Sequence, residues 1–195
     1  MERLHRFSID AIAPTSWKNG GGTTRELVSH PSNAGGNFDW RVSIATIDAA
    51  GPFSPFPGVD RTIMLLSGDG VRLTVSAMVD HLLNKPLTPF SFSGDWALQC
   101  TPLGGSSTDF NVMTRRGKYE SEVYVVSETC DIAPAAHGVL LAVNGTWTIS
   151  NDETRLPIEA GTGGWWQNAP YAWRATPQCD EGKLIVVRIL ESATP

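Results

Sequence analysis

Alternating hydrophobic and polar positions predict short β-strands along this chain. Between residues 38 and 45 every second side chain is hydrophobic, and the positions between them include Arg41 and Ser43. A period of two is typical of a strand that turns one face to a core. Residues 108–114 repeat the pattern, with Asn111 and Met113 on the more polar face. That face either meets solvent or lines a pocket, and the pattern alone leaves both alternatives open.

Two stretches of similar order predict an internal duplication. Residues 61–75 contain a hydrophobic strand, a Gly-Asp-Gly turn and a second strand, and residues 139–149 contain a strand, an Asn-Gly turn and a strand. Both patterns predict β-hairpins. Each is followed by a glycine-marked corner and a strand that contains Trp. We therefore expect two tandem β units that join near residues 119–136.

The stretch 17–26 contains three consecutive glycines among aromatic, amide and charged side chains, and it joins predicted strands at residues 7–12 and 26–28. Glycine lets backbone N–H groups come close to a ligand. A plain turn is the alternative, because Gly and Asn are the commonest turn residues. A phosphate-binding P-loop is excluded, since Lys18 precedes the glycines. Residues 31–37 are expected to form a turn-rich insert.

The stretch 17–26, together with the segments 40–45, 51–54 and 56–61, resembles the HutD/Ves family of bacterial proteins. The resemblance extends over essentially the whole chain. It implies an all-β fold, a cytoplasmic bicupin with two tandem cupin-type (jelly-roll) β-barrel units. We expect residues 1–118 to form the unit with a ligand pocket and residues 119–195 to form a second unit packed against it. The resemblance also implies either a regulatory role in histidine utilisation or a link to stress responses, with no reaction attached to either.

Composition narrows the classes of partner. A net charge of −5 and a pI near 5.3 argue against a broad nucleic-acid surface, which needs clustered Lys and Arg. No run approaches the roughly 18 apolar residues of a membrane helix. Three widely spaced cysteines fit neither a disulfide framework nor a zinc motif, so reduced thiols in the cytoplasm are expected. We expect no nucleic-acid partner and no membrane partner, and the chain could form a homodimer.

Metal chemistry and serine chemistry both lack a sequence signature. The four histidines stand far apart and form no His-x-His pair, whereas metal ligands usually come in convergent sets. No Gly-x-Ser-x-Gly elbow is present. We therefore expect no metal, no cofactor and no catalytic residue. A carboxylate pair formed by Glu26 with Asp60 or Asp95 is the exception, since these groups could act as acid and base or could brace arginines.

Arg41 and Arg61 indicate what the expected pocket would bind. A guanidinium binds a carboxylate through two parallel hydrogen bonds, and aromatic walls strengthen those bonds by excluding water. Because the resemblance points to histidine breakdown, urocanate and N-formylglutamate are the small anionic metabolites that we expect. The expected ligand-binding residues are Trp17, Asn19, Gly20, Gly21, Gly22, Thr23, Arg41, Ser43, Phe56, Arg61, Phe92, Asn111 and Met113.

Two alternatives to a non-catalytic binding protein remain open. The first is a metal-independent cupin enzyme that acts on a small organic acid, with Glu26 or Asp95 as base. The second is a protein-interaction scaffold, or a stress-related protein without catalysis, in which the glycine stretch is only structural.

Overall fold

A computed structural model describes residues 4–31 and 37–192, so residues 32–36 of the expected turn-rich insert lie outside it. The described residues form nineteen β-strands and one short 3-10 helix, η1 (Ile9–Ala11). The chain divides into two compact units, one from Ile12 to Lys118 and the other from Tyr119 onwards together with the residues up to Ala11. In the part of the chain that the structure describes, no helix is long and apolar enough to cross a bilayer.

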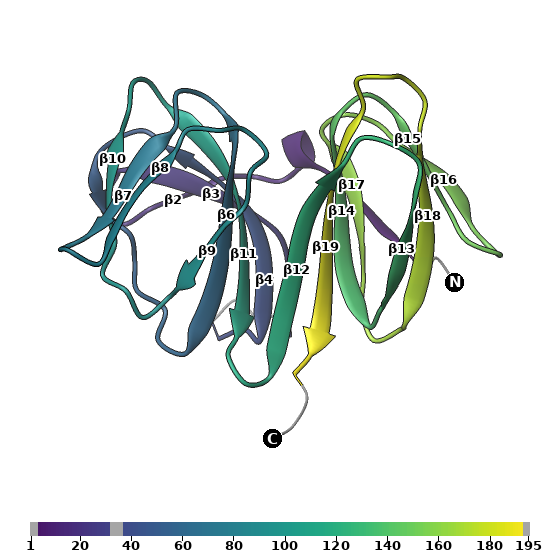
Figure 1. Ribbon diagram of the computed structural model, residues 1–195, viewed down its shortest axis with the longest axis horizontal. Coiled ribbons are helices and arrows are strands. Elements are labelled where there is room, and N and C mark those ends of the chain that lie inside the picture. The colour runs from purple at the N-terminus through teal and green to yellow at the C-terminus, as the bar shows by residue number, and fades with distance from the viewer. Residues whose placement is uncertain (1–3, 32–36, 193–195) are drawn as a thin grey trace. The chain divides into compact units, whose positions relative to one another are not determined.

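The unit 12–118 consists of two antiparallel sheets (Figure 1). The larger sheet has the strand order β2 (Thr15–Ser16), β3 (Gly22–His30), β4 (Trp40–Ile47), β11 (Ser107–Arg115), β6 (Val59–Ser67) and β9 (Phe90–Ser93). The smaller sheet has the strand order β5 (Gly51–Pro52), β10 (Gln99–Pro102), β7 (Val71–Val75) and β8 (Val79–Leu83).

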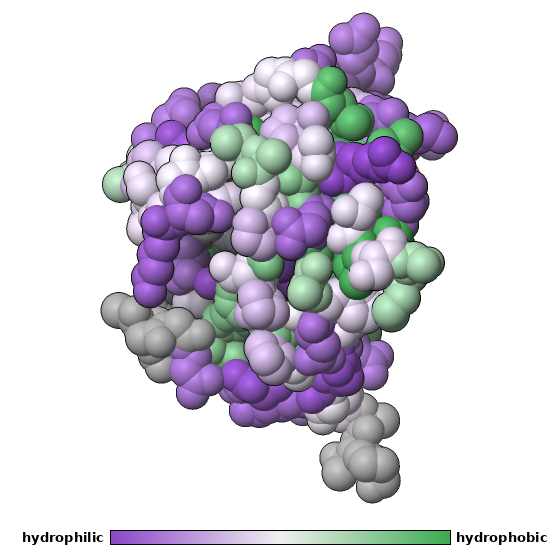
Figure 2. Space-filling view, turned by 90° about the vertical axis from the view of Figure 1, so that its left-hand side faces the viewer, coloured by the Kyte–Doolittle hydropathy of each residue, from purple (hydrophilic) through white to green (hydrophobic). Residues whose placement is uncertain are grey.

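Hydrophobic side chains from both sheets form the core of this unit. Ile63 and Leu65 of β6 share one cluster with Leu73 of β7 and Cys100 of β10. Burying a side chain of this size stabilises a fold by about 1.5–3 kcal/mol. Figure 2 shows the molecule from the side of β7, β8 and β10, where residues of hydrophilic and intermediate hydropathy cover most of the surface and hydrophobic ones appear in small groups. The hydrophobic residues of this unit therefore gather mainly between its sheets.

The other unit also has two antiparallel sheets. The five-stranded sheet has the order β1 (His5–Ser8), β17 (Thr162–Trp166), β14 (His137–Asn144), β19 (Lys183–Glu191) and β12 (Tyr119–Val126). The four-stranded sheet has the order β13 (Cys130–Ala135), β18 (Tyr171–Pro177), β15 (Trp147–Ser150) and β16 (Arg155–Ile158). Three buried tryptophans, Trp147, Trp166 and Trp173, fill much of its core.

Both predicted hairpins are wrong as pairings, although their strands exist. The stretch 61–75 contains β6 and β7, but β6 pairs with β11 and β9, while β7 pairs with β10 and β8. Likewise β14 and β15 belong to different sheets. Each glycine turn carries the chain from one sheet to the other. Gly68 and Gly70 both have positive φ, and a Cβ on Gly68 would overlap the carbonyl oxygen of Ser106, so a close crossing rather than a hairpin requires glycine there.

The N-terminal strand also pairs differently from the prediction. Residues 7–12 were expected to join residues 26–28 through the glycine stretch, yet β1 pairs with β17, and the partner of β3 across the glycines is the two-residue strand β2. The unit boundary lies between Lys118 and Tyr119, where the ranges 1–118 and 119–195 meet. The difference from those ranges is that the segment up to Ala11 belongs with the later part of the chain. The sequence of so short a strand does not indicate which distant strand it pairs with.

Candidate functional site

The floor of the site is one face of the three central strands β4, β11 and β6. Their antiparallel register aligns alternate residues into three rows across the sheet. Because side chains alternate between the two faces of a strand, all members of these rows share one face. The first row is Arg41–Met113–Arg61, the second is Ser43–Asn111–Ile63, and the third is Ala45–Asp109–Leu65.

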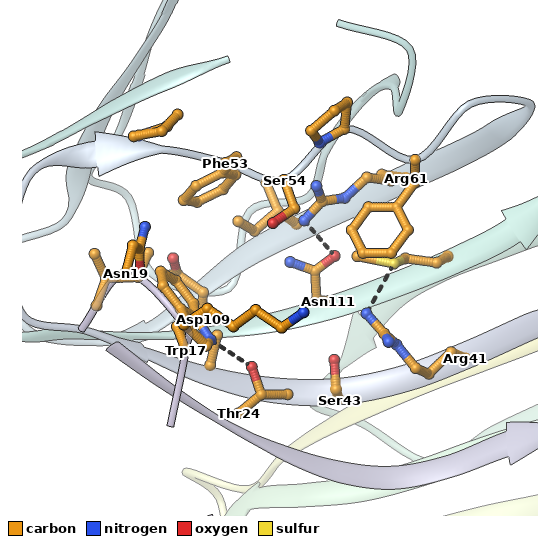
Figure 3. Close-up of a pocket in the computed structure, with 18 of the residues that line it drawn as sticks. Trp17, Asn19, Thr24, Arg41, Ser43, Phe53, Ser54, Arg61, Asp109 and Asn111 are labelled. Atoms are coloured by element: carbon orange, nitrogen blue, oxygen red, sulfur yellow. Dashed lines mark hydrogen bonds between the residues drawn. The ribbon is translucent and has the colours of Figure 1, made fainter. Parts of the chain in front are cut away.

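A cavity of about 630 Å³ lies over this floor, a volume typical of small-molecule sites (Figure 3). The β2–β3 loop contributes Trp17, Lys18 and Asn19 to its wall. The segment 52–56 contributes a further, largely apolar part of the wall, which includes Phe53 and Phe56. Three prolines between residues 52 and 57 stiffen this segment. The cavity belongs wholly to the unit 12–118.

Arg61 is a buried cation without a carboxylate partner among the described residues. Only 6% of the residue is exposed, its Nη2 donates a hydrogen bond to Asn111 Oδ1 at 3.2 Å, and its buried Nε has no partner. Its guanidinium carbon lies 4.9 Å from the ring centre of Phe92 and 5.5 Å from those of Phe53 and Phe56. Burial, followed by the charge of Arg41, lowers the pKa of Arg61 to about 9. The side chain is therefore charged at neutral pH and under-supplied with acceptors.

Arg41 stands across the first row from Arg61 and is also poorly supplied with acceptors. Its Nη2 lies 3.3 Å from the sulfur of Met113, a weak acceptor, and its buried Nε has no partner in the described part of the chain. Its guanidinium carbon lies 4.7 Å from the ring centre of Phe38 and 5.3 Å from that of Phe56. Burial lowers the pKa of Arg41, and the carboxylate of Glu26 opposes that shift. Two guanidinium groups thus share one aromatic environment at this end of the cavity.

Asp109 lies in the third row, at the other end of the floor. The residue is completely buried, and among the residues that the structure describes neither of its carboxylate oxygens has a hydrogen-bond partner. Burial raises the pKa of Asp109 to about 7. Burial, and then the charge of Asp109, raises the pKa of Cys100 to about 12, so that thiol stays protonated at neutral pH. A buried carboxyl without a hydrogen-bond partner calls for an explanation, and this one borders a cavity.

The three glycines shape the β2–β3 loop and do not line the cavity. Trp17 N donates to Gly22 O at 2.9 Å, and Gly21 N donates to the side-chain oxygen of Asn19 at 3.1 Å. A Cβ on Gly22 would overlap the carbonyl oxygen of Thr46, whereas a Cβ on Gly21 would find space. The loop thereby brings the Trp17 side chain over the floor. The idea that glycine N–H groups face a ligand finds no counterpart in this geometry.

Most of the predicted site residues meet in this one cavity. Those that line it are Trp17, Asn19, Arg41, Ser43, Phe56, Arg61, Asn111 and Met113. Those that do not are Gly20, Gly21, Gly22, Thr23 and Phe92, and Phe92 instead packs behind Arg61. The lining residues that the sequence analysis missed are Ser16, Lys18, Thr24, Ala45, Ile47, Pro52, Phe53, Ser54, Pro55, Ile63 and Asp109. The alternation that selected Asn111 and Met113 also included Asp109, so period two could have found that carboxyl.

The histidines lie apart in the structure. His5 stacks on Trp165, and His81 stacks on Phe90. His137 accepts a hydrogen bond at Nδ1 from the backbone N–H of Asn168. Within residues 4–31 and 37–192, no three His, Cys, Asp or Glu side chains cluster in a way that could hold a metal ion. The cavity therefore offers its polar side chains, rather than a metal ligand set, for chemistry.

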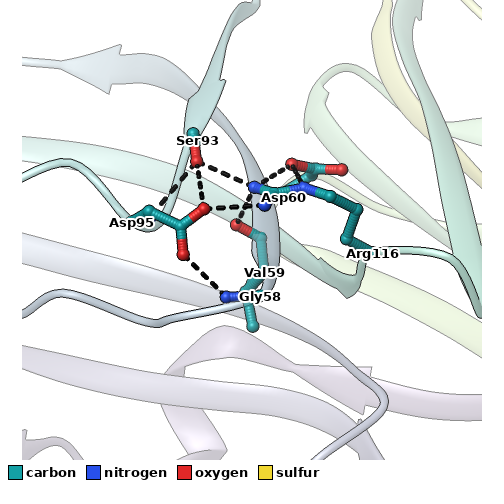
Figure 4. Close-up of polar contacts among 6 residues, drawn as sticks. All are labelled: Gly58, Val59, Asp60, Ser93, Asp95 and Arg116. Atoms are coloured by element: carbon teal, nitrogen blue, oxygen red, sulfur yellow. Dashed lines mark hydrogen bonds and ion pairs between the residues drawn. The ribbon is translucent and has the colours of Figure 1, made fainter.

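The carboxylates considered as bases lie outside the cavity lining. Asp60 and Asp95 each accept a hydrogen bond from Arg116 at 2.7 Å (Figure 4). Hydrogen bonds from Arg116, from the Gly58 N–H and from Ser93 lower the pKa of Asp95 to about 2. The exposed Glu26 accepts from Ser29 at 2.7 Å. The interpretation of Asp60 and Asp95 as groups that brace an arginine fits this geometry, but the arginine is Arg116 and not Arg61.

Comparisons with known proteins agree on one family. The HutD family model matches residues 10–185. Protein Ves from Citrobacter koseri is 34% identical over 187 residues, which cover 95% of this chain and 94% of that protein. A conserved protein of unknown function from Pseudomonas aeruginosa PAO1 has a TM-score of 0.86 at 26% identity, covering 97% of this chain and 100% of that one.

The solved structures also identify the type of fold. HutD from Pseudomonas fluorescens SBW25 has a TM-score of 0.83 at 24% identity, covering 97% of this chain and 100% of that chain. Together with more distant neighbours such as Ylba from E. coli, this likeness shows a cupin-like all-β fold. The match of the family model over most of the chain and the identity to Ves proteins then lead to one conclusion: this chain belongs to the HutD/Ves family.

Proposed function

We propose that this chain is a cytoplasmic bicupin, built from two tandem jelly-roll units, that binds a small carboxylate in the cavity of the unit 12–118. In this proposal it serves as a regulatory or accessory factor of histidine utilisation, and its ligand is urocanate or N-formylglutamate. Membership of the HutD/Ves family supports the pathway. The observation that carries the ligand class is Arg61, a buried cation that lines a cavity and has no carboxylate partner among the described residues.

A bound carboxylate would supply what Arg61 lacks. Leaving a buried charged group short of hydrogen-bond partners costs more than 1–3 kcal/mol, the order found for neutral groups. A planar carboxylate fits the planar guanidinium through two bonds, which an aromatic surround strengthens by excluding water. Phe53 and Phe56 provide that surround, and Arg41 brings a second cation to the same end. The four groups together favour a small anion over a neutral ligand.

A metal-independent enzyme acting on a small organic acid is the second candidate, and Asp109 is the observation that favours it. A buried carboxyl with a pKa near 7 is suited to proton transfer at neutral pH. Asp109 would then take the role that the sequence analysis gave to Glu26 or Asp95, since neither of those two lines the cavity. Chromatography of each acid after incubation with the protein separates this enzyme from a binding protein.

Calorimetric titration of urocanate and N-formylglutamate into wild type and Arg61→Lys tests the binding function. Lysine keeps the charge but loses the two-pronged geometry, so we expect a loss of about 1.5–3 kcal/mol, or roughly 10- to 150-fold in Kd. The melting temperature should change little. Unchanged affinity with a lowered melting temperature would remove Arg61 from the site. Binding of neither acid by wild type would contradict our choice of ligands.

A further inference from the structure

The cavity floor carries opposite chemistry at its two ends. Arg41 and Arg61 lie in the first row, and Asp109 lies in the third. All three side chains line the same cavity. A carboxylate held by the arginines explains the first row only. It leaves both oxygens of Asp109 without a partner, in a residue with no exposed surface.

Within residues 4–31 and 37–192, Asp109 has no hydrogen-bond partner for its carboxyl oxygens. Its cross-strand neighbours in the third row are Ala45 and Leu65, neither of which has a polar side chain. Cys100, from the opposite sheet, is a thiol whose pKa is raised by burial and then by the charge of Asp109, so it stays protonated near that carboxyl. The cost of burying a carboxyl without hydrogen bonds is therefore not offset within the fold. Arg61, a cation of the first row, is instead hydrogen-bonded to Asn111 of the second row.

The spacing of the rows sets the length of a ligand that reaches both ends. The Nη2 of Arg61 contacts Asn111 at 3.2 Å, so its guanidinium lies over the second row. Asp109 is two residues from Asn111 along β11, which corresponds to about 7 Å. The lining between them includes Ile63 and Ala45, which are apolar. A molecule with a carboxylate, a short apolar body and a polar group roughly 7 Å away spans this distance.

We propose that Asp109 accepts a hydrogen bond from an N–H group of the ligand whose carboxylate binds Arg61. The site then selects a small acid that bears an N–H donor at its far end, and it rejects an acid of the same shape without that donor. This inference rests on the proposed function, because it assumes a carboxylate at Arg61. A site built to bond an N–H group discriminates strongly against an analogue that lacks it, since the acceptor would be left buried and unpaired.

Two probes with the same acrylate group test the inference. Urocanate has an imidazole N–H, and 3-(2-furyl)acrylate has a furan ring of similar size without any N–H. We expect calorimetry on wild type to show at least tenfold tighter binding of urocanate. Asp109→Ala should bring the two affinities within about threefold of each other. Asp80→Ala is the matched control, since Asp80 pairs with Arg72 on the surface, outside the cavity lining, and its loss should preserve the wild-type ratio.

The outcomes separate the two levels of the proposal. Equal binding of both probes by wild type would contradict the role of Asp109. It would still agree with a carboxylate site at Arg61. A ratio in Asp109→Ala equal to that of wild type would also contradict the role of Asp109. Binding of neither probe removes urocanate from the proposed function, and the inference falls with it. The wild-type comparison does not depend on the folding of any variant, and melting curves establish whether Asp109→Ala is folded.

Discussion

Arg61 and Arg116 show two opposite ways in which this protein uses a guanidinium. Arg116 is half-exposed, and it donates to Asp60, Asp95 and Ser93 at 2.7–2.8 Å. Arg61 is buried, and among the described residues its polar contact is the amide oxygen of Asn111. Asp60 and Arg61 are neighbours on β6, but alternation turns the first to solvent and the second to the cavity. The two faces of β6 therefore differ: on one side Asp60 pairs with Arg116, and on the other Arg61 lacks a carboxylate partner among the described residues.

The contrast shows which arginine supports the structure and which is free for a ligand. Asp95 accepts a hydrogen bond from Gly58 N at 2.8 Å, and Phe56 N donates to Gly94 O at 2.7 Å. The group around Arg116 thus holds the segment that brings Phe56 to the cavity. The unsatisfied donors of Arg61 do not hold any described segment in place. A cation kept buried at a cost points to a binding role rather than to stability.

Replacing each arginine by methionine should give the largest and clearest separation of these roles. Arg61→Met removes two charge-assisted hydrogen bonds to a ligand carboxylate, about 3–6 kcal/mol in all, so we expect urocanate affinity to fall at least 100-fold. Its melting temperature should stay level or rise, because an unpaired buried charge is gone. Arg116→Met should lower the melting temperature by a few degrees and retain most of the affinity. Calorimetry and thermal melts measure both.

The reverse pattern would contradict these two roles of Arg61 and Arg116. If Arg61→Met lowered the melting temperature and left affinity intact, Arg61 would be a structural residue. If Arg116→Met abolished binding while the protein stayed folded, the position of Phe56 would control the site more than the cavity arginine does.

The sequence predicted the two cations of the site and not the environment that distinguishes them. Period two placed Arg41 and Ser43 on one face of a strand, and that interpretation matches the register of β4 and β11. It could not show that Asp60 turns away to pair with Arg116, 56 positions later in the chain. Partners at such separation are set by sheet register, which a single sequence does not state.

The same limit applied to the fold: local patterns indicated the strands but not their long-range partners. Strand positions could be predicted from local alternation, but pairing could not, because β6 and β7 join different sheets across the Gly68–Gly70 turn. A hairpin and a crossing between sheets both call for glycine with positive φ, so the turn residues do not distinguish them. The expectation that the glycines at 20–22 bind the ligand had a similar origin. Their conformational freedom was visible in the sequence, whereas the close packing of Gly22 against Thr46 was not.

Two carboxyl groups extend the comparison to pH. The pKa of Asp109 is raised to about 7 by burial, so between about pH 4 and 7 the native state holds a proton that the unfolded state has lost. Wild-type stability should therefore fall across this window as pH rises. Asp109→Asn lacks that loss, and it should be more stable than wild type above pH 7 by on the order of a few kcal/mol and equal to it below pH 4.

Asp95 should behave in the opposite way. Its pKa is lowered to about 2 by hydrogen bonds from Arg116, Gly58 and Ser93, so its contribution is present above about pH 4 and is lost as pH falls towards 2. Asp95→Asn should be less stable than wild type at neutral pH and should converge with it in acid. Urea unfolding from pH 2 to 8 compares the three proteins. Parallel profiles for Asp109→Asn and wild type would contradict the protonation of Asp109.

The smallest expected effect concerns Met113, which lies between the two arginines of the first row. Its sulfur is 3.3 Å from Arg41 Nη2, and its side chain packs with Phe38, Val59 and Phe56. Leucine has a similar volume, so Met113→Leu should cost less than about 1.5 kcal/mol of stability, because a thioether is a weak acceptor. Affinity for urocanate should change by less than about threefold if the guanidinium groups alone hold the carboxylate. A tenfold loss in calorimetry, with an unchanged melting temperature, would mean that the sulfur fixes the direction of Arg41. Arg41, Met113 and Arg61 would then bind the carboxylate together. Arg61 would not be the single residue that distinguishes the cavity side of β6 from the Arg116 side.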